Sequence, residues 1–237
     1  MKEIKWLVFL AVGVAATVGG LAAWAYPVEN PDCAARYAPM AEAFARGDWY
    51  EAFHPRFCIL FQILTGSLVW LTNCSGVAAC QIVSAAFLGL SVIPYWYIMR
   101  RVFDSATAWL AVAILLVLPR ISGDAMNGLR DPGRILAVCC WVLGFFNMLD
   151  KKRGAAALQA LGLFIMVTLK IDCFAPAAAM CMATIFLSVR KRDWRTLVMC
   201  ASAFVVSSLS VCTMNWFFTG WFVPAPQYIH IFGGNAI

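Results

Sequence analysis

The run WLVFLAVGVAATVGGLAAWAY, residues 6–26, decides the fold of this chain. It carries no charge and has the length of about 20 apolar residues that a helix needs to cross a bilayer. Similar apolar runs follow it, and the whole chain is 63% hydrophobic and only 13% charged. Because lipid offers no water to backbone groups, and no run alternates with period two, these runs are expected to be α-helices rather than barrel strands. The sequence therefore predicts an all-α, polytopic membrane helical bundle.

The run at 57–71 is the ambiguous one, and the basic clusters decide how to read it. If it does not cross, the clusters at 100–101, 151–153 and 190–192 all fall on the cytoplasmic side, as the positive-inside rule requires. If it crossed, all three would face outward. We therefore interpret 57–71 as a re-entrant or half-inserted helix. This interpretation gives about seven transmembrane helices, with the N-terminus in the cytoplasm of a plasma (inner) membrane.

The expected organisation is a single membrane domain over residues 1–237. Its parts are a first span (6–26), an outer loop with juxtamembrane helices (27–76), six further spans (77–216) and an outer tail (217–237). Among the six spans, the run at 155–169 is one, and residues 120–134 form an outer loop between two others. The Ala23-Trp24-Ala25 triplet leaves a cleaved signal peptide as the competing interpretation of the first run, although the run is longer than a usual signal core. Either way, the following loop lies outside the cytoplasm.

The outer loop begins with a helix signal. Asn30 followed by Pro31 is typical of a helix start, and Gly47 of a helix end. Between them Tyr37 recurs on one face with Met40 and Phe44, whereas Pro39 is expected to kink or divide the helix. This pattern predicts a short amphipathic helix at the membrane surface. Cys33, Cys58 and Cys74 lie in or near this loop, which leaves a disulfide among them open; most of the other cysteines lie in apolar runs as small hydrophobic residues.

The predicted topology gathers the ionisable residues of three loops on the outer side. Carboxylates beside arginines suit a phosphorylated lipid, because guanidinium groups bind phosphate and a carboxylate can act as a base or hold a divalent cation. The alternative is that these charges are merely solvated. The net charge of +6 does not indicate a nucleic-acid site, because the sequence contains no basic stripe with interleaved aromatic residues. The residues concerned are Glu29, Asp32, Arg36, Glu42, Arg46, Asp48, Glu51, His54, Arg56, Arg120, Asp124, Arg130, Asp131, Arg134, Lys170 and Asp172.

Several motifs resemble the GT-C glycosyltransferases, and within them the protein mannosyltransferase and aminoarabinose transferase type. The first loop carries Glu29-Asn30-Pro31-Asp32, then Tyr37, then MAEAFARGDW at 40–49, then His54-Pro55. Further matches are PYWY at 94–97, Arg100-Arg101-Val102-Phe103, Leu118-Pro119 and Leu129-Arg130-Asp131-Pro132. The resemblance covers roughly residues 6–149. It implies transfer of a sugar from a polyprenyl-phosphate donor to an acceptor, at the outer face of the membrane in the cell envelope.

The resemblance also implies roles for individual residues. Asp32 would be the catalytic carboxylate, as a base or a metal ligand, with Glu29 as its partner or substitute and Asp131 as the second acidic residue and second candidate ligand of a divalent cation. We expect the Asp32 side chain to face a basic hollow that binds the lipid-linked phosphate. His54 would help to hold the donor phosphate. Substrate binding is further expected from Tyr37, Arg56, Arg130, Arg134 and Lys170.

The sequence also departs from the family pattern. Arg56 stands where a second proline is usual, no Asp-Glu pair follows the first span, and the chain ends at Ile237 where relatives continue. A short or truncated member is therefore expected. The alternative function is a non-catalytic membrane protein that binds lipid phosphate or a partner subunit. A transporter ranks third, because the spans lack buried charges and paired broken helices.

Overall fold

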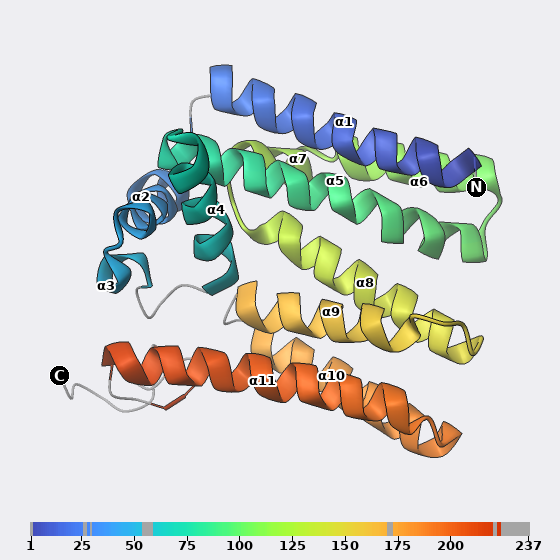
Figure 1. The fold of residues 1–237 in the computed structure, drawn as a ribbon. Coiled ribbons are helices and arrows are strands. Elements are labelled where there is room, and N and C mark those ends of the chain that lie inside the picture. Colours follow the sequence, from blue (N-terminus) through green and yellow to red (C-terminus); the bar gives the residue numbers. More distant parts are fainter. Residues whose placement is uncertain are drawn as a thin grey trace.

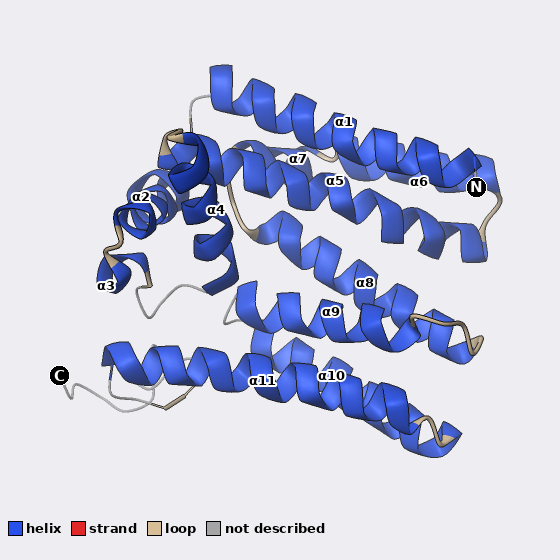
Figure 2. Ribbon diagram, in the orientation of Figure 1, coloured by secondary structure: helices blue, strands red, loops and turns tan. Residues whose placement is uncertain are grey.

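The protein is a bundle of long helices, most of which run side by side (Figure 1). The structure is a computed structural model, and it describes residues 2–25, 28, 30–53, 59–169, 173–219 and 222–223. Within these ranges all regular structure is helical, with eleven α-helices and one π-helix (Figure 2). The predicted all-α bundle is confirmed.

Five of the described helices are long and apolar enough to cross a membrane, and they suggest an integral membrane protein. Helices α6 (Ser105–Val117) and α7 (Pro119–Met126) would form a sixth span together, although they meet at an angle of 53°. The five are α1 (Lys2–Ala25), α5 (Gly76–Val102), α8 (Asp131–Leu149), α10 (Phe174–Lys191) and α11 (Trp194–Thr219).

The helix lengths differ from the expected spans at three places. Residues 120–126, expected as part of a loop, are helical in α7, because Pro119 starts a new helix at a bend instead of ending the segment. The expected span at 155–169 is helix α9 (Ala155–Leu169), which has only 15 residues and is mostly buried between neighbouring helices. Helix α11 extends to Thr219, into the residues expected to form the tail.

Helix α4 (Ile59–Thr72) occupies the ambiguous run and lies across the long helices (Figure 1). Its 14 residues would rise about 21 Å as an α-helix, which is short of the roughly 30 Å hydrocarbon core. Its buried face includes Phe61 and Gln62, so it packs into the end of the bundle. This geometry agrees with the re-entrant interpretation.

Two helix pairs approach closely at glycines. A Cβ added to Gly89 of α5 would lie 2.4 Å from the Ala11 carbonyl oxygen of α1. In the same way, a Cβ on Gly162 of α9 would lie 2.6 Å from the Ala137 oxygen of α8. Small residues at such crossings let helix backbones pack tightly, which supplies much of the association energy inside a membrane.

The first loop forms the π-helix η1 (Cys33–Tyr37), then α2 (Ala38–Arg46) and α3 (Trp49–Ala52). The predicted start is confirmed, because the Asn30 side chain accepts a 2.9 Å hydrogen bond from the Asp32 backbone N–H. The predicted end is confirmed too, with Gly47 left-handed at a φ of 79°. Residues 31–46 are helical without interruption and pass from π to α geometry at Ala38, so the division expected at Pro39 is not seen. The buried face of this helix, with Tyr37 and Met40, packs on the bundle.

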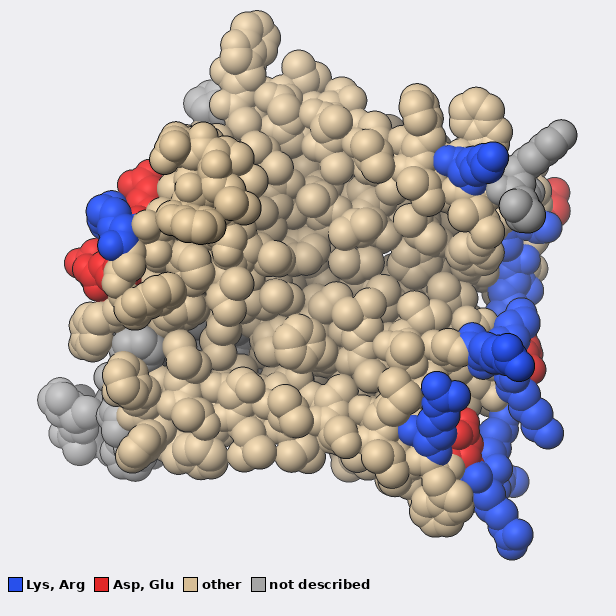
Figure 3. Space-filling view, in the orientation of Figure 1, with Lys and Arg blue, Asp and Glu red and all other residues tan. Residues whose placement is uncertain are grey.

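Charged residues gather at the two ends of the face shown in Figure 3, with an uncharged band between them. The turns after α5, α8 and α10 lie together at one end with the N-terminus, and we call this the basic end (residues 100–105, 149–155 and 190–195). The opposite end carries η1, α2 and α4. We call it the loop end, defined by residues 30–53 and 126–134.

Candidate functional site

The loop end is built by hydrogen bonds between segments that are distant in sequence. The side-chain oxygen of Asn127 accepts a 3.3 Å hydrogen bond from the Asn30 backbone N–H. Gln81 of α5 donates its side-chain N–H to the Met126 carbonyl at 2.8 Å, and the Ser84 hydroxyl donates to the Leu129 carbonyl. These bonds fasten the α7–α8 connection to α5 and to the first loop. Two of the three loops that the sequence proposed for the site therefore lie at the same end of the molecule, and the third, at residues 170–172, lies outside the described residues.

Arg130 lies at the centre of this junction. It is 9% exposed, and its guanidinium carbon is 5.3 Å from the centre of the Tyr37 ring. The same ring also contacts Phe61 of α4, edge-on at 5.6 Å. A π face stabilises a buried cation, and more strongly where water is excluded. Tyr37, which is itself 4% exposed, therefore supports Arg130 at this junction, and its role in substrate binding stays a prediction.

Asp32 lies on the surface side of the same segment. Its carboxylate accepts a 3.0 Å hydrogen bond from Arg36 one turn later, and the two side chains are 47% and 51% exposed. Asp32 therefore does not point into an enclosed basic hollow; it forms a half-exposed ion pair beside the junction. Such a carboxylate is accessible to a substrate at the membrane surface.

Asp131 is the first residue of α8, directly after Arg130. It accepts a 2.6 Å hydrogen bond from Arg134, and the two side chains are 31% and 44% exposed. A carboxylate in the first turn is favoured by the positive end of the helix dipole. Asp131 and Arg134 thus repeat the arrangement of Asp32 and Arg36, each pair lying within one helical turn.

Other carboxylates near the site have structural roles. Glu42 accepts a 2.9 Å hydrogen bond from the Gly76 backbone N–H, and so supplies an acceptor to the first turn of α5. Asp48 caps α3 by accepting from the Glu51 N–H at 3.2 Å. Asp124 pairs with Arg120 at 3.8 Å. The sequence alone grouped these three carboxylates with Asp32 and Asp131, but their contacts give them structural roles.

Four expected site residues, Glu29, His54, Arg56 and Lys170, lie outside the described residues. Within the described part of the chain, no three or more His, Cys, Asp or Glu side chains are grouped as a metal site would require. The role of Asp32 and Asp131 as metal ligands thus stays a prediction.

The sequence interpretation missed the residues that join the two loops. Gln81 and Ser84 are three positions apart in an apolar span, which places two polar groups on one helix face. That spacing was a readable signal. Cys33 and Cys80 were not predicted to meet, yet both are buried, and the hydrogen bond between their thiols lowers the pKa of Cys33. Cys33 and Cys74 are free thiols, and Cys58 lies outside the described residues.

Comparisons with known proteins add no assignment to this geometry. No protein-family model, no curated protein and no solved structure matches the chain.

Proposed function

We propose that this protein is a membrane glycosyltransferase that moves a sugar from a polyprenyl-phosphate donor to an acceptor, with its site at the loop end. The observation that supports the proposal is the junction of Arg130 with the first loop, flanked by the Asp32–Arg36 and Asp131–Arg134 pairs. The junction lies at the opposite end of the bundle from the basic turns. Under the positive-inside rule the proposal puts this junction on the outer side of the membrane, the side that the resemblance to GT-C glycosyltransferases implies.

The proposed reaction assigns Asp32 as the general base. The acceptor hydroxyl attacks the anomeric carbon of the donor sugar, the bond from that carbon to the phosphate oxygen breaks, and the hydroxyl proton passes to the Asp32 carboxylate. Polyprenyl phosphate leaves as an anion. Arg36 and Arg134 are half exposed and able to bind that phosphate through paired N–H donors. The alternative role for Asp32 and Asp131 is to hold a divalent cation against the same phosphate.

The test is donor dependence in reconstituted vesicles. The purified protein is incorporated with a radiolabelled polyprenyl-phosphate sugar, and loss of label from the lipid phase is followed with a panel of hydroxyl acceptors. The proposal expects protein-dependent loss of label with at least one donor. Failure of every polyprenyl-phosphate sugar to react with a folded, inserted protein would overturn it.

A second function is supported by one specific observation. Both candidate carboxylates are already paired with an arginine on their own helix. That arrangement also suits a non-catalytic protein that binds lipid phosphate or a partner subunit. Under that function, polyprenyl-phosphate binding survives Asp32→Asn and weakens with Arg134→Gln, and no label is transferred in either case.

A further inference from the structure

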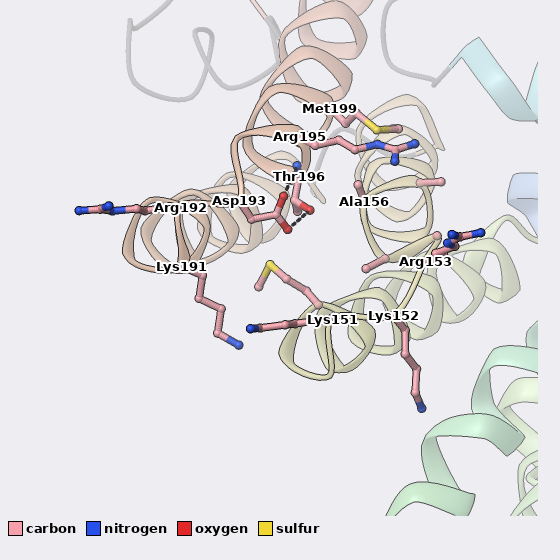
Figure 4. Close-up of a pocket in the computed structure, with 14 residues that line it drawn as sticks. Lys151, Lys152, Arg153, Ala156, Lys191, Arg192, Asp193, Arg195, Thr196 and Met199 are labelled. Carbon is pink, nitrogen blue, oxygen red and sulfur yellow. Dashed lines mark hydrogen bonds between the residues drawn. The ribbon is translucent and has the colours of Figure 1, made fainter.

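A hollow of about 380 Å³ opens at the basic end, between the turn that joins α8 to α9 and the turn that joins α10 to α11 (Figure 4). Lys151 and Lys191 extend toward each other from the two turns, while Arg192 points away. Residues 151–157 form one side and residues 191–193, 195 and 196 the other, and Met148 and Met199 complete the lining. The six basic residues of the lining are Lys151, Lys152, Arg153, Lys191, Arg192 and Arg195.

The lining contains a single carboxylate, that of Asp193, and it caps a helix. Asp193 accepts a 3.1 Å hydrogen bond from the Thr196 backbone N–H and a 2.6 Å bond from its hydroxyl, which caps the start of α11. The cations therefore greatly outnumber the carboxylates around this space. Lys191 donates to the Leu149 carbonyl at 3.4 Å, a neutral partner that leaves its charge in place.

The N-terminus of α9 adds to the positive potential. Ala155, Ala156 and Ala157 of α9 line the hollow, so the first turn of this helix borders it. That turn contains no acidic residue, whereas the start of α11 already carries the Asp193 carboxylate as its cap. Backbone N–H groups and the helix dipole at such ends favour an anion, phosphate above all.

A neighbouring hollow provides an internal comparison. It is lined by Arg100, Arg101 and Lys152, but there the Asp150 carboxylate accepts hydrogen bonds from both terminal nitrogens of Arg101 and pairs with Lys152 at 3.4 Å. Basic residues at a cytoplasmic end need no ligand to explain them. The first hollow differs in two respects: its one carboxylate caps α11, whereas Asp150 pairs with basic residues, and the first turn of α9 borders it.

We propose that this hollow is a binding site for a phosphate group, and that the phosphate is the headgroup of an anionic phospholipid. The side chains next to it favour a lipid over a soluble phosphate. Trp194 and Val198 of α11 are 63% and 57% exposed on a helix of spanning length, so apolar surface adjoins the basic lining. Tryptophan at a helix end is typical of the membrane–water interface, the level at which headgroups lie. This site is at the opposite end from the proposed transferase site and does not depend on it.

The test measures equilibrium binding to the full-length protein, stripped of lipid in a non-ionic detergent. Three probes are titrated: micelles with phosphatidylglycerol, micelles with phosphatidylcholine, and inorganic phosphate. The variant is Lys191→Gln with Arg195→Gln. Its matched control is Arg100→Gln with Arg190→Gln, which removes two charges from the same end but outside the hollow.

We expect saturable binding of phosphatidylglycerol, weakened about 30-fold in the variant, because each basic residue contributes about 1 kcal/mol at an anionic membrane surface. The control should bind normally, as should the charge-conserving Lys191→Arg with Arg195→Lys, which also tests folding. Equal losses of phosphatidylglycerol affinity in the variant and the control would contradict a specific site, because they would mean that general surface charge causes the binding. If inorganic phosphate bound tightly and phosphatidylglycerol did not bind, the proposal that the ligand is a lipid would be wrong. If neither probe bound saturably, the proposed site itself would be wrong.

Discussion

The guanidinium carbon of Arg130 lies 5.3 Å from the centre of the Tyr37 ring, although the two residues belong to separate loops. This contact joins the first loop to the start of α8. Tyr37 also packs edge-on against Phe61, so three segments meet around its ring. We infer that this ring fixes the position of Arg130 at the loop end, and the first prediction tests it.

Replacing Tyr37 with leucine should destabilise the loop end. The leucine keeps an apolar side chain but removes the π face that faces Arg130, a loss of about 1–2 kcal/mol for a desolvated pair. The measurement is equilibrium unfolding in detergent. Tyr37→Phe keeps the ring and serves as the control for the cation–π contact. An equal loss of stability in both variants would contradict the role assigned to the ring.

The crossing of α1 and α5 predicts that Gly89→Ala is destabilising. The added Cβ would lie 2.4 Å from the Ala11 carbonyl oxygen, so the two backbones must move apart. We expect a loss of about 1–3 kcal/mol, as for overpacked cores. Gly20→Ala in α1 is the matched control, because nothing lies within 4 Å of the added Cβ. Thermal unfolding of the two variants should separate them clearly; similar melting temperatures would argue against a close crossing.

A buried polar network predicts the effect of Thr184→Val. The Thr184 hydroxyl donates to the Gln159 side-chain oxygen at 2.7 Å and accepts from the Trp141 ring N–H at 3.1 Å. Valine of similar shape leaves both partners without this hydrogen bond, at a cost of about 1 kcal/mol inside a membrane protein. Thr184→Ser keeps the hydroxyl and should lose less. Stability is measured by unfolding in detergent, and a neutral valine variant would contradict the network.

The Asp150 carboxyl predicts a pH dependence at the basic end. Its pKa is lowered from 3.8 to about 2, first by the hydrogen bond from Arg101. Because the folded pKa lies below the unfolded one, the stabilisation is fully present above about pH 4 and is lost as the pH falls through about 2. The melting-temperature difference between the wild type and Asp150→Asn should therefore shrink between pH 4 and pH 2. A difference that stays constant over this range would contradict the assignment.

Much of the fold could be predicted because its signals are local. Runs of apolar residues locate the helices, Asn30 and Gly47 mark the ends of the first-loop helix, and the basic clusters predict which turns share an end. Helix α4 has 14 residues, a length that suits the re-entrant interpretation of this run. Helix α7 was missed because Arg120 and Asp124 look like loop residues, although they pair one turn apart within it.

The candidate site could be predicted only in part. The sequence identified the carboxylates and arginines of the candidate site, and the expected topology predicted that the first two outer loops lie at the same end of the molecule. It could not supply pairwise contacts, so Gln81, Ser84 and the stack of Arg130 on Tyr37 were missed. It also placed Asp32 in a basic hollow, whereas the side chain is 47% exposed beside Arg36. Such contacts depend on how distant segments pack, and a single sequence does not encode this in its local pattern.

The most direct measurement compares sugar transfer by the wild type, Asp32→Asn and Glu51→Gln in vesicles containing the labelled donor lipid. Glu51 lies in the same loop and loses the same charge, so it controls for electrostatics and folding. We expect Asp32→Asn to lose transfer by at least 100-fold, the lower range for removing a general base, while Glu51→Gln keeps it. Normal transfer by a folded Asp32→Asn protein would contradict the assignment of Asp32 as the catalytic carboxylate.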